Sequence, residues 1–200
     1  METLALYLIL GYLIGSLPFA VIVSKLFGLA DPRSFGSGNP GATNVLRSGN
    51  KAAAALTLLG DASKGWLAMW LAAQVGAGET AAALAGLAAF VGHLYPVFLK
   101  FGGGKGVATA LGVLLWLDAW VALGAALVWF ATALVSRYAS LAALAAACVA
   151  PTLALAWHGF GPVALVVMPM CLLLIWRHRG NLGRLIEGSE RRIGDKQRSS

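Results

Sequence analysis

Charged residues are scarce in this chain: they make up 12% of its 200 residues, and only eight of them are acidic. Hydrophobic residues make up 59%, and the mean hydropathy is +0.78. A soluble domain of this length could not bury so much apolar surface, which excludes a water-soluble globular protein. The apolar runs reach the roughly 20 residues that a helix needs to cross a bilayer. The sequence therefore predicts an all-α, polytopic membrane protein.

Cysteine and histidine are also rare, with two and three residues respectively. Cys148 and Cys171 lie in apolar runs without ligand residues beside them, so we expect buried packing rather than a disulfide or a metal site. The carboxylates are scattered, which excludes a paired-carboxylate site, and no cluster has the spacing of metal ligands. We expect neither a metal nor another cofactor.

The net charge of +7 does not indicate a nucleic-acid partner. Lysine and arginine lie in short connections and in the C-terminal tail, not along a basic face with interleaved aromatic residues. Such a distribution is typical of residues that orient a membrane protein or contact anions and lipid headgroups.

Seven apolar segments predict a bundle of about seven transmembrane helices in a single domain, residues 1–200. The segments are 3–27, 52–75, 80–99, 106–117, 119–136, 139–157 and 161–176. Alternate connections hold the positive residues Lys25, Arg33, Arg47, Lys51, Lys100, Lys105 and Arg137, and the tail 177–200 is basic. The other connections, "QVGAGE", "LDAW" and "HGFG", hold none. The positive-inside rule then places the N-terminus outside and the C-terminus in the cytoplasm.

The segment 106–117 leaves the number of crossings open. The whole segment, which contains "VATALGVLLWL", gives only about 18 Å of helix, against a hydrocarbon core of about 30 Å. A half-span or a re-entrant helix is tolerated at this depth only if its end is buried in protein or lines a wet cavity. A topology of five spans is therefore the alternative, and it keeps the tail on the same side.

The stretch "RSFGSGNPGATNVLR", residues 33–47, is rich in glycine and amides for a turn between spans. Glycine lets the backbone turn tightly and approach a ligand, and Arg47 offers two parallel hydrogen bonds to a phosphate. The residues expected to bind phosphate are Gly36, Ser37, Gly38, Asn39, Gly41, Thr43, Asn44 and Arg47. The spacing of a Walker loop is absent, and a plain cytoplasmic turn is the alternative.

The stretch "GHLYPVFLKFGGGKGVAT", residues 92–109, places glycines and Lys105 directly before a new apolar segment. Backbone N–H groups at a helix start, with a lysine beside them, form an anion site. We expect Gly103, Gly104 and Lys105 to bind phosphate, and a charge that only sets the topology is the alternative for Lys105. His93 fits a catalytic role and a packed histidine bonded to a neighbouring helix equally well.

The stretch "RHRGNLGRLIEGSERRIG", residues 177–194, carries His178 and Asn181 on one face if the last helix continues through it. Arg184 and Glu187 have the spacing of a pair on such a helix. A basic tail that touches anionic lipid would explain the arginines, but not His178 and Asn181.

The stretch "GDASKG" places Asp61 and Lys64 inside the second apolar segment. Charges at membrane depth usually face the bundle interior and pair with one another, and this spacing permits such a pair. A structural ion pair is favoured, and a supporting role beside a site is the alternative.

Together these motifs resemble those of the bacterial acyl-phosphate:glycerol-3-phosphate acyltransferase family. The family pattern has GSGN-x-GATN-x-x-R, D-x-x-KG, GH-x-x-P-x-F…GGKG-x-AT and H-x-x-N…RL-x-x-G-x-E. This chain matches them in order at residues 36–47, 61–65, 92–109 and 178–190. The resemblance thus spans nearly the whole chain.

The resemblance implies transfer of a fatty acyl group from acyl phosphate to glycerol 3-phosphate, which gives lysophosphatidic acid and inorganic phosphate. It implies a multi-pass protein of the bacterial cytoplasmic (inner) membrane, with its active site on the cytoplasmic side. The catalytic residues would be Ser37, Lys105, His178 and Asn181, with support from Asp61, Lys64, His93 and Glu190. The base would be either His178 or a phosphate oxygen of the substrate, and the lack of a visible histidine–carboxylate pair favours the substrate. Membrane lipid is the remaining expected partner, and no obligate protein partner is inferred.

Two other classes of protein compete with this interpretation. A transporter for a phosphorylated metabolite would also use broken helices with N–H groups at their ends, but it predicts an internal repeat and polar groups on both sides. The sequence shows no repeat, and its outside connections are short and nearly featureless. A scaffold that binds anionic lipid would not need His178, Asn181 or the asparagines of residues 33–47.

Overall fold

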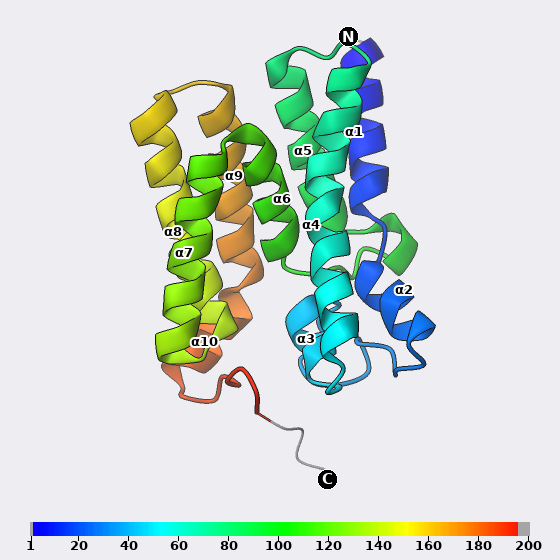
Figure 1. Ribbon diagram of the computed structural model, residues 1–200, viewed down its shortest axis with the longest axis vertical. Coiled ribbons are helices and arrows are strands. Elements are labelled where there is room, and N and C mark those ends of the chain that lie inside the picture. The colour runs from blue at the N-terminus through cyan, green and yellow to red at the C-terminus, as the bar shows by residue number, and fades with distance from the viewer. Residues whose placement is uncertain (1, 196–200) are drawn as a thin grey trace.

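The computed structural model describes residues 2–195, and every regular element within them is a helix (Figure 1). The elements of this part of the chain are α1 (Glu2–Gly15), α2 (Phe19–Leu26), α3 (Ala42–Leu46), α4 (Lys51–Gln74), α5 (Glu79–Leu94), the 3₁₀ helix η1 (Val97–Leu99), α6 (Val107–Leu117), α7 (Ala119–Ser136), α8 (Ala139–His158), α9 (Pro162–Arg177) and α10 (Arg179–Ile186). The predicted all-α fold is confirmed.

Several of these helices are long and apolar enough to cross a membrane. Within residues 2–195 the four candidate spans are Thr3–Leu26, Glu79–Leu99, Ala119–Ser136 and Ala139–His158. The pair α9 and α10, bent by 52° at His178, is a fifth candidate. The chain is therefore a multi-pass membrane protein. Each predicted apolar segment contains a helix, but seven crossings and the orientation of the termini stay predictions.

The first predicted segment, 3–27, forms two helices rather than one. Pro18 has no backbone N–H and its ring clashes with the preceding turn, so α1 ends at Gly15 and α2 begins at Phe19. The break frees the carbonyl of Leu17, which accepts a hydrogen bond of 2.9 Å from Nζ of Lys64. An interrupted helix thus provides a buried lysine of α4 with a partner.

The helices form two groups. In one group α1 packs along α5, and α4 packs on α5 and α6; in the other, α7, α8 and α9 pack in sequence (Figure 1). Small residues let the first group pack closely: a Cβ on Gly11 or Gly15 of α1 would strike the backbone carbonyls of Ala85 or Ala89 in α5. Such contacts are typical of helices that associate inside a membrane.

Gly112 of α6 provides the clearest test of this packing. A Cβ at this position would strike the carbonyl oxygen of Ala62 in α4. We expect Gly112→Ala to push α6 off α4 and to lower the free energy of unfolding by on the order of 2 kcal/mol, measured as a lower thermal midpoint in detergent. Gly183→Ala is the matched control, because Gly183 is also helical and has open space at its Cβ position. Equal midpoints for the two variants would contradict the close contact.

The polar connections gather at one end of the bundle. In Figure 1, α3, α10 and the described end of the tail lie at the end opposite the N-terminus. The stretches 33–47 and 177–194, far apart in the sequence, therefore share this end, and the loop before α6 reaches the second of them through the contact of Lys105 with Asn181. This arrangement brings the predicted motifs together.

Candidate active site

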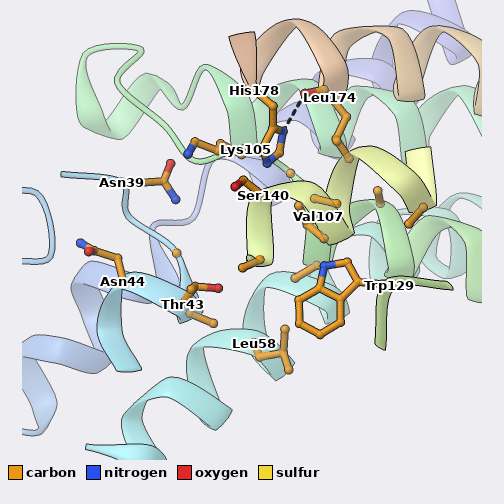
Figure 2. Close-up of a pocket in the computed structure, with 18 of the residues that line it drawn as sticks. Asn39, Thr43, Asn44, Leu58, Lys105, Val107, Trp129, Ser140, Leu174 and His178 are labelled. Carbon is orange, nitrogen blue, oxygen red and sulfur yellow. Dashed lines mark hydrogen bonds between the residues drawn. The ribbon is translucent and has the colours of Figure 1, made fainter. Parts of the chain in front are cut away.

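The predicted polar stretches surround a cavity of about 940 Å³ between the two groups of helices (Figure 2). The predicted site residues that line it are Gly36, Ser37, Asn39, Gly41, Thr43, Asn44, Arg47, Asp61, His93, Lys105, His178, Asn181 and Glu190. Those that do not line it are Gly38, Lys64, Gly103 and Gly104. Most of the predicted site is thus brought to one cavity from four separate stretches of the sequence.

Away from this polar end, the cavity continues as an apolar slot between the helices. It is lined by Leu58 of α4, Leu111 of α6, Trp129 of α7, Met170 of α9 and a face of α8 from Ser140 to Ala150. That face gives the slot a length of about 15 Å. Figure 2 shows Leu58 and Trp129 on the side away from Asn39 and Lys105.

The slot is open on one side. Helices α4 and α7 hardly touch each other, although both line the slot. Leu58 of α4 lines the cavity and is nevertheless 48% exposed. An apolar chain in the slot would therefore meet the surrounding lipid between α4 and α7.

Asn44 holds the loop 33–47 together from inside, where it is 1% exposed. Its Nδ2 donates to the carbonyls of Pro32 at 2.6 Å and Phe35 at 3.1 Å. Its Oδ1 accepts from the N–H of Ser37 at 2.9 Å and from Nη1 of Arg47 at 3.2 Å. The amide of Asn44 is therefore engaged within the loop and positions Ser37 and Arg47, and its contact with phosphate stays a prediction.

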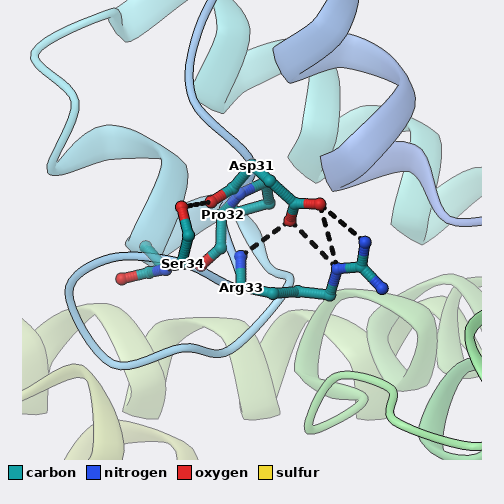
Figure 3. Close-up of polar contacts among 5 residues, drawn as sticks. Asp31, Pro32, Arg33 and Ser34 are labelled. Carbon is teal, nitrogen blue, oxygen red and sulfur yellow. Dashed lines mark hydrogen bonds and ion pairs between the residues drawn. The ribbon is translucent and has the colours of Figure 1, made fainter.

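Two further features shape this loop. Gly36 and Gly38 have φ values of +62° and +67°, a region that favours glycine, and a Cβ on Gly36 would strike Asn44. Before them, Nη2 of Arg33 donates to Oδ2 of Asp31 at 2.6 Å, and the Ser34 hydroxyl donates to the Asp31 carbonyl (Figure 3). The hydrogen bonds from Arg33 lower the pKa of the Asp31 carboxyl. Arg33 is thus engaged outside the cavity.

A chain of hydrogen bonds joins Lys105 to the C-terminal segment. Nζ of Lys105 donates to Oδ1 of Asn181 at 2.6 Å, and Nδ2 of Asn181 donates to Oε1 of Glu190 at 2.6 Å. Glu190 also accepts from the Ser140 hydroxyl at 2.8 Å and from Nε of Arg184 at 2.7 Å. Glu190 therefore fixes the amide of Asn181 with its oxygen toward Lys105.

The predicted pair of Arg184 with Glu187 is wrong. Helix α10 ends at Ile186, and Gly188, with φ +71°, turns the chain back so that Glu190 pairs with Arg184. Burial raises the pKa of the Glu190 carboxyl, but the hydrogen bonds that it accepts outweigh burial and hold the pKa below its ordinary value. Glu190 is therefore an anion that is ion-paired with Arg184.

Gly103 and Gly104 pack against the end of α5. The N–H of Gly104 donates to the carbonyl of His93 at 3.1 Å. A Cβ on Gly104 would strike the His93 ring, and one on Gly103 would strike the carbonyl of His93. The structure thus gives both glycines a packing role, and their contacts with phosphate stay predictions.

The predicted ion pair of Asp61 and Lys64 is present and buried, with 2.8 Å between Oδ1 and Nζ. Nδ1 of His93 lies 2.9 Å from Nζ of Lys64 and 3.4 Å from Oδ1 of Asp61. Of the two alternatives left open for His93, this geometry matches the packed histidine bonded to a neighbouring helix.

His178 lies at the bend between α9 and α10, so the assumption of one continuous helix through His178 and Asn181 is wrong. The side chain is buried, and Nδ1 lies 2.8 Å from the carbonyl oxygen of Leu174. A carbonyl only accepts, so the neutral ring carries its hydrogen on Nδ1 and leaves a lone pair on Nε2. Figure 2 shows the ring beside Lys105 at the polar end of the cavity.

Lys105 lies in the connection between α5 and α6, where burial lowers its pKa to about 8. If the ammonium form binds a substrate anion, kcat/KM should fall as the pH rises through about 8. Lys105→Arg keeps its charge far above this pH and should lose that alkaline limb. Measuring kcat/KM between about pH 6 and pH 10 tests this, and the same limb in both enzymes would contradict it.

Comparison with known proteins identifies the family. The family model described as glycerol-3-phosphate acyltransferase matches residues 5–188. The chain belongs to the glycerol-3-phosphate acyltransferase family. Among members of this family, the chain is 59% identical over 189 residues to that of Aromatoleum aromaticum, covering 94% of this chain and 96% of the relative. It is 61% identical over 196 residues to that of Bordetella petrii, covering 94% and 92%. The family resemblance inferred from the motifs is confirmed.

Solved structures of this family have the same fold. The crystal structure of PlsY (YgiH), an integral membrane glycerol 3-phosphate acyltransferase, in its glycerol 3-phosphate form gives a TM-score of 0.89 at 39% identity over 96% of both chains. Its lysophosphatidic acid form gives a TM-score of 0.87 at 38% identity, over 96% of this chain and 95% of that chain.

Proposed function

We propose that this glycerol-3-phosphate acyltransferase uses acyl phosphate as its donor and releases lysophosphatidic acid and inorganic phosphate. The observation that carries the proposal is the continuity of the cavity, whose basic, hydroxyl-rich end opens directly into the apolar slot. An acyl phosphate has both parts, a charged head and a hydrocarbon chain. The proposed acceptor, glycerol 3-phosphate, and the proposed product, lysophosphatidic acid, are the compounds after which the two PlsY forms are named.

The phosphate groups would be held between Arg47 and Lys105, which line the polar end from different segments. Ser37, Asn39 and Thr43 would supply further hydrogen bonds from the loop 33–47. Because an acyl phosphate is already activated, the main contributions of the protein are positioning and stabilisation of developing charge. The proposed reaction uses no metal or other cofactor.

In the chemical step, a hydroxyl oxygen of glycerol 3-phosphate attacks the acyl carbonyl carbon. The bond from that carbon to the phosphate oxygen breaks, and phosphate leaves with the electron pair. His178 and Asn181 would orient the acceptor, and its proton would pass to a phosphate oxygen. The hydrogen bond of His178 to the Leu174 carbonyl, rather than to a carboxylate, supports this assignment over His178 as the base.

We further propose a single domain with seven crossings in the bacterial cytoplasmic membrane, the N-terminus outside and the active site on the cytoplasmic side. The distribution of lysine and arginine supports this orientation. The position of α3 and α10 at the end opposite the N-terminus supports the placement of the site.

Phosphate release by the purified protein in detergent tests the donor. With palmitoyl phosphate we expect release that requires glycerol 3-phosphate, without added metal. If acyl transfer occurred only with acyl-CoA or with acylated acyl carrier protein, the choice of donor would be wrong, and the acylation of glycerol 3-phosphate would still hold. Inertness with every donor would favour a transporter, although the deep end of the cavity, lined by apolar residues of α6 to α9, argues against a polar path across the membrane.

The apolar slot predicts a dependence on acyl-chain length. Ala147 of α8 is 3% exposed and lines the slot about 10 Å along the helix from Ser140. Ala147→Phe should lower kcat/KM for palmitoyl phosphate at least about tenfold more than for hexanoyl phosphate, because the ring obstructs the longer chain. Cys148→Phe is the matched control: the buried packing expected for Cys148 is wrong, because the residue is exposed, and it lies outside the cavity lining. Equal losses with both donors would argue that the chain does not occupy the slot.

A further inference from the structure

We propose that Arg177 is a positioning residue, which fixes the glycine-rich loop before α6 so that the ammonium of Lys105 meets Asn181. This inference rests on the proposed role of Lys105 in binding phosphate. Arg177 itself does not line the cavity. It would therefore act through Lys105 and not by contact with substrate.

The contacts of Arg177 with the loop are direct. Nη2 donates to the carbonyls of Gly103 at 2.9 Å and Gly104 at 3.1 Å, and Nε donates to that of Gly104 at 3.2 Å. One planar guanidinium thus holds the two consecutive carbonyls that precede Lys105. The Cζ atom of Arg177 also lies 5.2 Å from the centroid of the Tyr95 ring, so the ring packs against the guanidinium.

The opposite edge of the same loop is fixed by α5. The N–H of Gly104 donates to the carbonyl of His93, and the His93 ring fills the space where a Cβ of Gly104 would lie. The side chains of Asp61 and Lys64 hold that ring in turn. Asp61, Lys64 and His93 thus fix the N–H side of the loop, and Arg177 fixes its carbonyl side.

The loop needs such restraints because of its composition. Gly102, Gly103 and Gly104 have no side chains to pack, and glycine has the most conformational freedom to lose. The Lys105–Asn181 hydrogen bond of 2.6 Å requires this flexible loop to keep a fixed position relative to α10. Arg177 provides that connection, because it directly precedes His178 and lies four residues before Asn181.

The electrostatic surroundings give the proposal a distinctive signature. Lys105 donates a hydrogen bond to the neutral amide of Asn181. The charged groups that act on Lys105 are Glu190, Arg184, Arg47 and Arg177. Loss of Arg177 removes one cation and lets the loop admit water to Lys105. Both changes favour the ammonium form, so they move the alkaline limb of kcat/KM to higher pH.

The test compares Arg177→Gln and Arg177→Lys with the control Arg179→Gln. Arg179 is exposed, and its guanidinium lies over the Trp176 ring, outside the cavity lining. We expect kcat/KM to fall about 10- to 100-fold in Arg177→Gln, with a smaller loss in Arg177→Lys and none in the control. The alkaline limb should move to higher pH in Arg177→Gln only.

A second measurement does not depend on turnover: the pH dependence of Lys105 labelling by an amine reagent, followed by mass spectrometry without substrate. We expect Lys105 of Arg177→Gln to titrate at higher pH than that of the wild type and of Arg179→Gln. Unchanged labelling together with an unchanged alkaline limb would overturn the proposal, even if activity fell, because that loss would reflect general destabilisation. A wild type without phosphate release would overturn the proposed donor alone, since the labelling result would stand.

Discussion

Replacing Lys105 with alanine is expected to lower kcat/KM for acyl transfer by about a hundred- to a thousandfold. The ammonium of Lys105 lies at the polar end of the cavity, where burial lowers its pKa and weakens competition from water. A cation in such a site stabilises phosphate charge more strongly than one in open solvent. Lys105→Ala also leaves Oδ1 of Asn181 without the donor that orients it.

Lys100→Ala is the matched control for Lys105→Ala. Lys100 lies in the same connection, is exposed and does not line the cavity, so its loss removes the same positive charge from the same side of the bundle. Phosphate release at saturating glycerol 3-phosphate should be unchanged in this control. If a folded Lys105→Ala protein stayed within about tenfold of the wild type, Lys105 would be a topology-setting charge.

His178 gives the second large effect, and two substitutions separate its possible roles. We expect His178→Ala to lower kcat about a hundredfold, because the side chain would no longer offer an acceptor to the glycerol hydroxyl. His178→Gln places an amide oxygen close to the position of Nε2, but that oxygen has almost no basicity. If the substrate phosphate takes the proton, His178→Gln should retain activity within about tenfold of the wild type.

A different result for His178→Gln would identify the base. Activity as low as that of His178→Ala, with loss of the acidic limb of the pH–kcat profile, would assign proton transfer to His178 itself. The thermal midpoints of both variants provide the control for folding, since His178 is buried at the bend between α9 and α10.

The positions of the helices could be predicted from the sequence because hydrophobic length is a local property. The breaks within them were harder to predict. Pro18 was present as a signal, but the apolar run on both sides of it indicated one continuous span. The bend at His178 has no local signal, because the residues of α10 are compatible with a continued helix; contacts of Arg177 and Asn181 with distant segments accompany it.

The location of residues at the cavity was predictable where polar residues are out of place in an apolar chain, as at Lys105 and His178. The contacts of single atoms were not, because they depend on the folded loops: the amide of Asn44 is engaged within its own loop. Ser140 and Arg177 escaped prediction for the same reason. A lone serine in an alanine-rich helix and an arginine at a helix end have no distinctive pattern until the fold places them.

The open side between α4 and α7 gives the two products of the proposed reaction separate exits. Inorganic phosphate would leave from the polar end into water, while the acylated product would slide its tail past Leu58 directly into the bilayer. Exposure of a palmitoyl tail to water would cost about 12 kcal/mol, at about 0.8 kcal/mol for each CH₂ group. Lateral release would avoid that barrier and would deliver the product directly into the membrane.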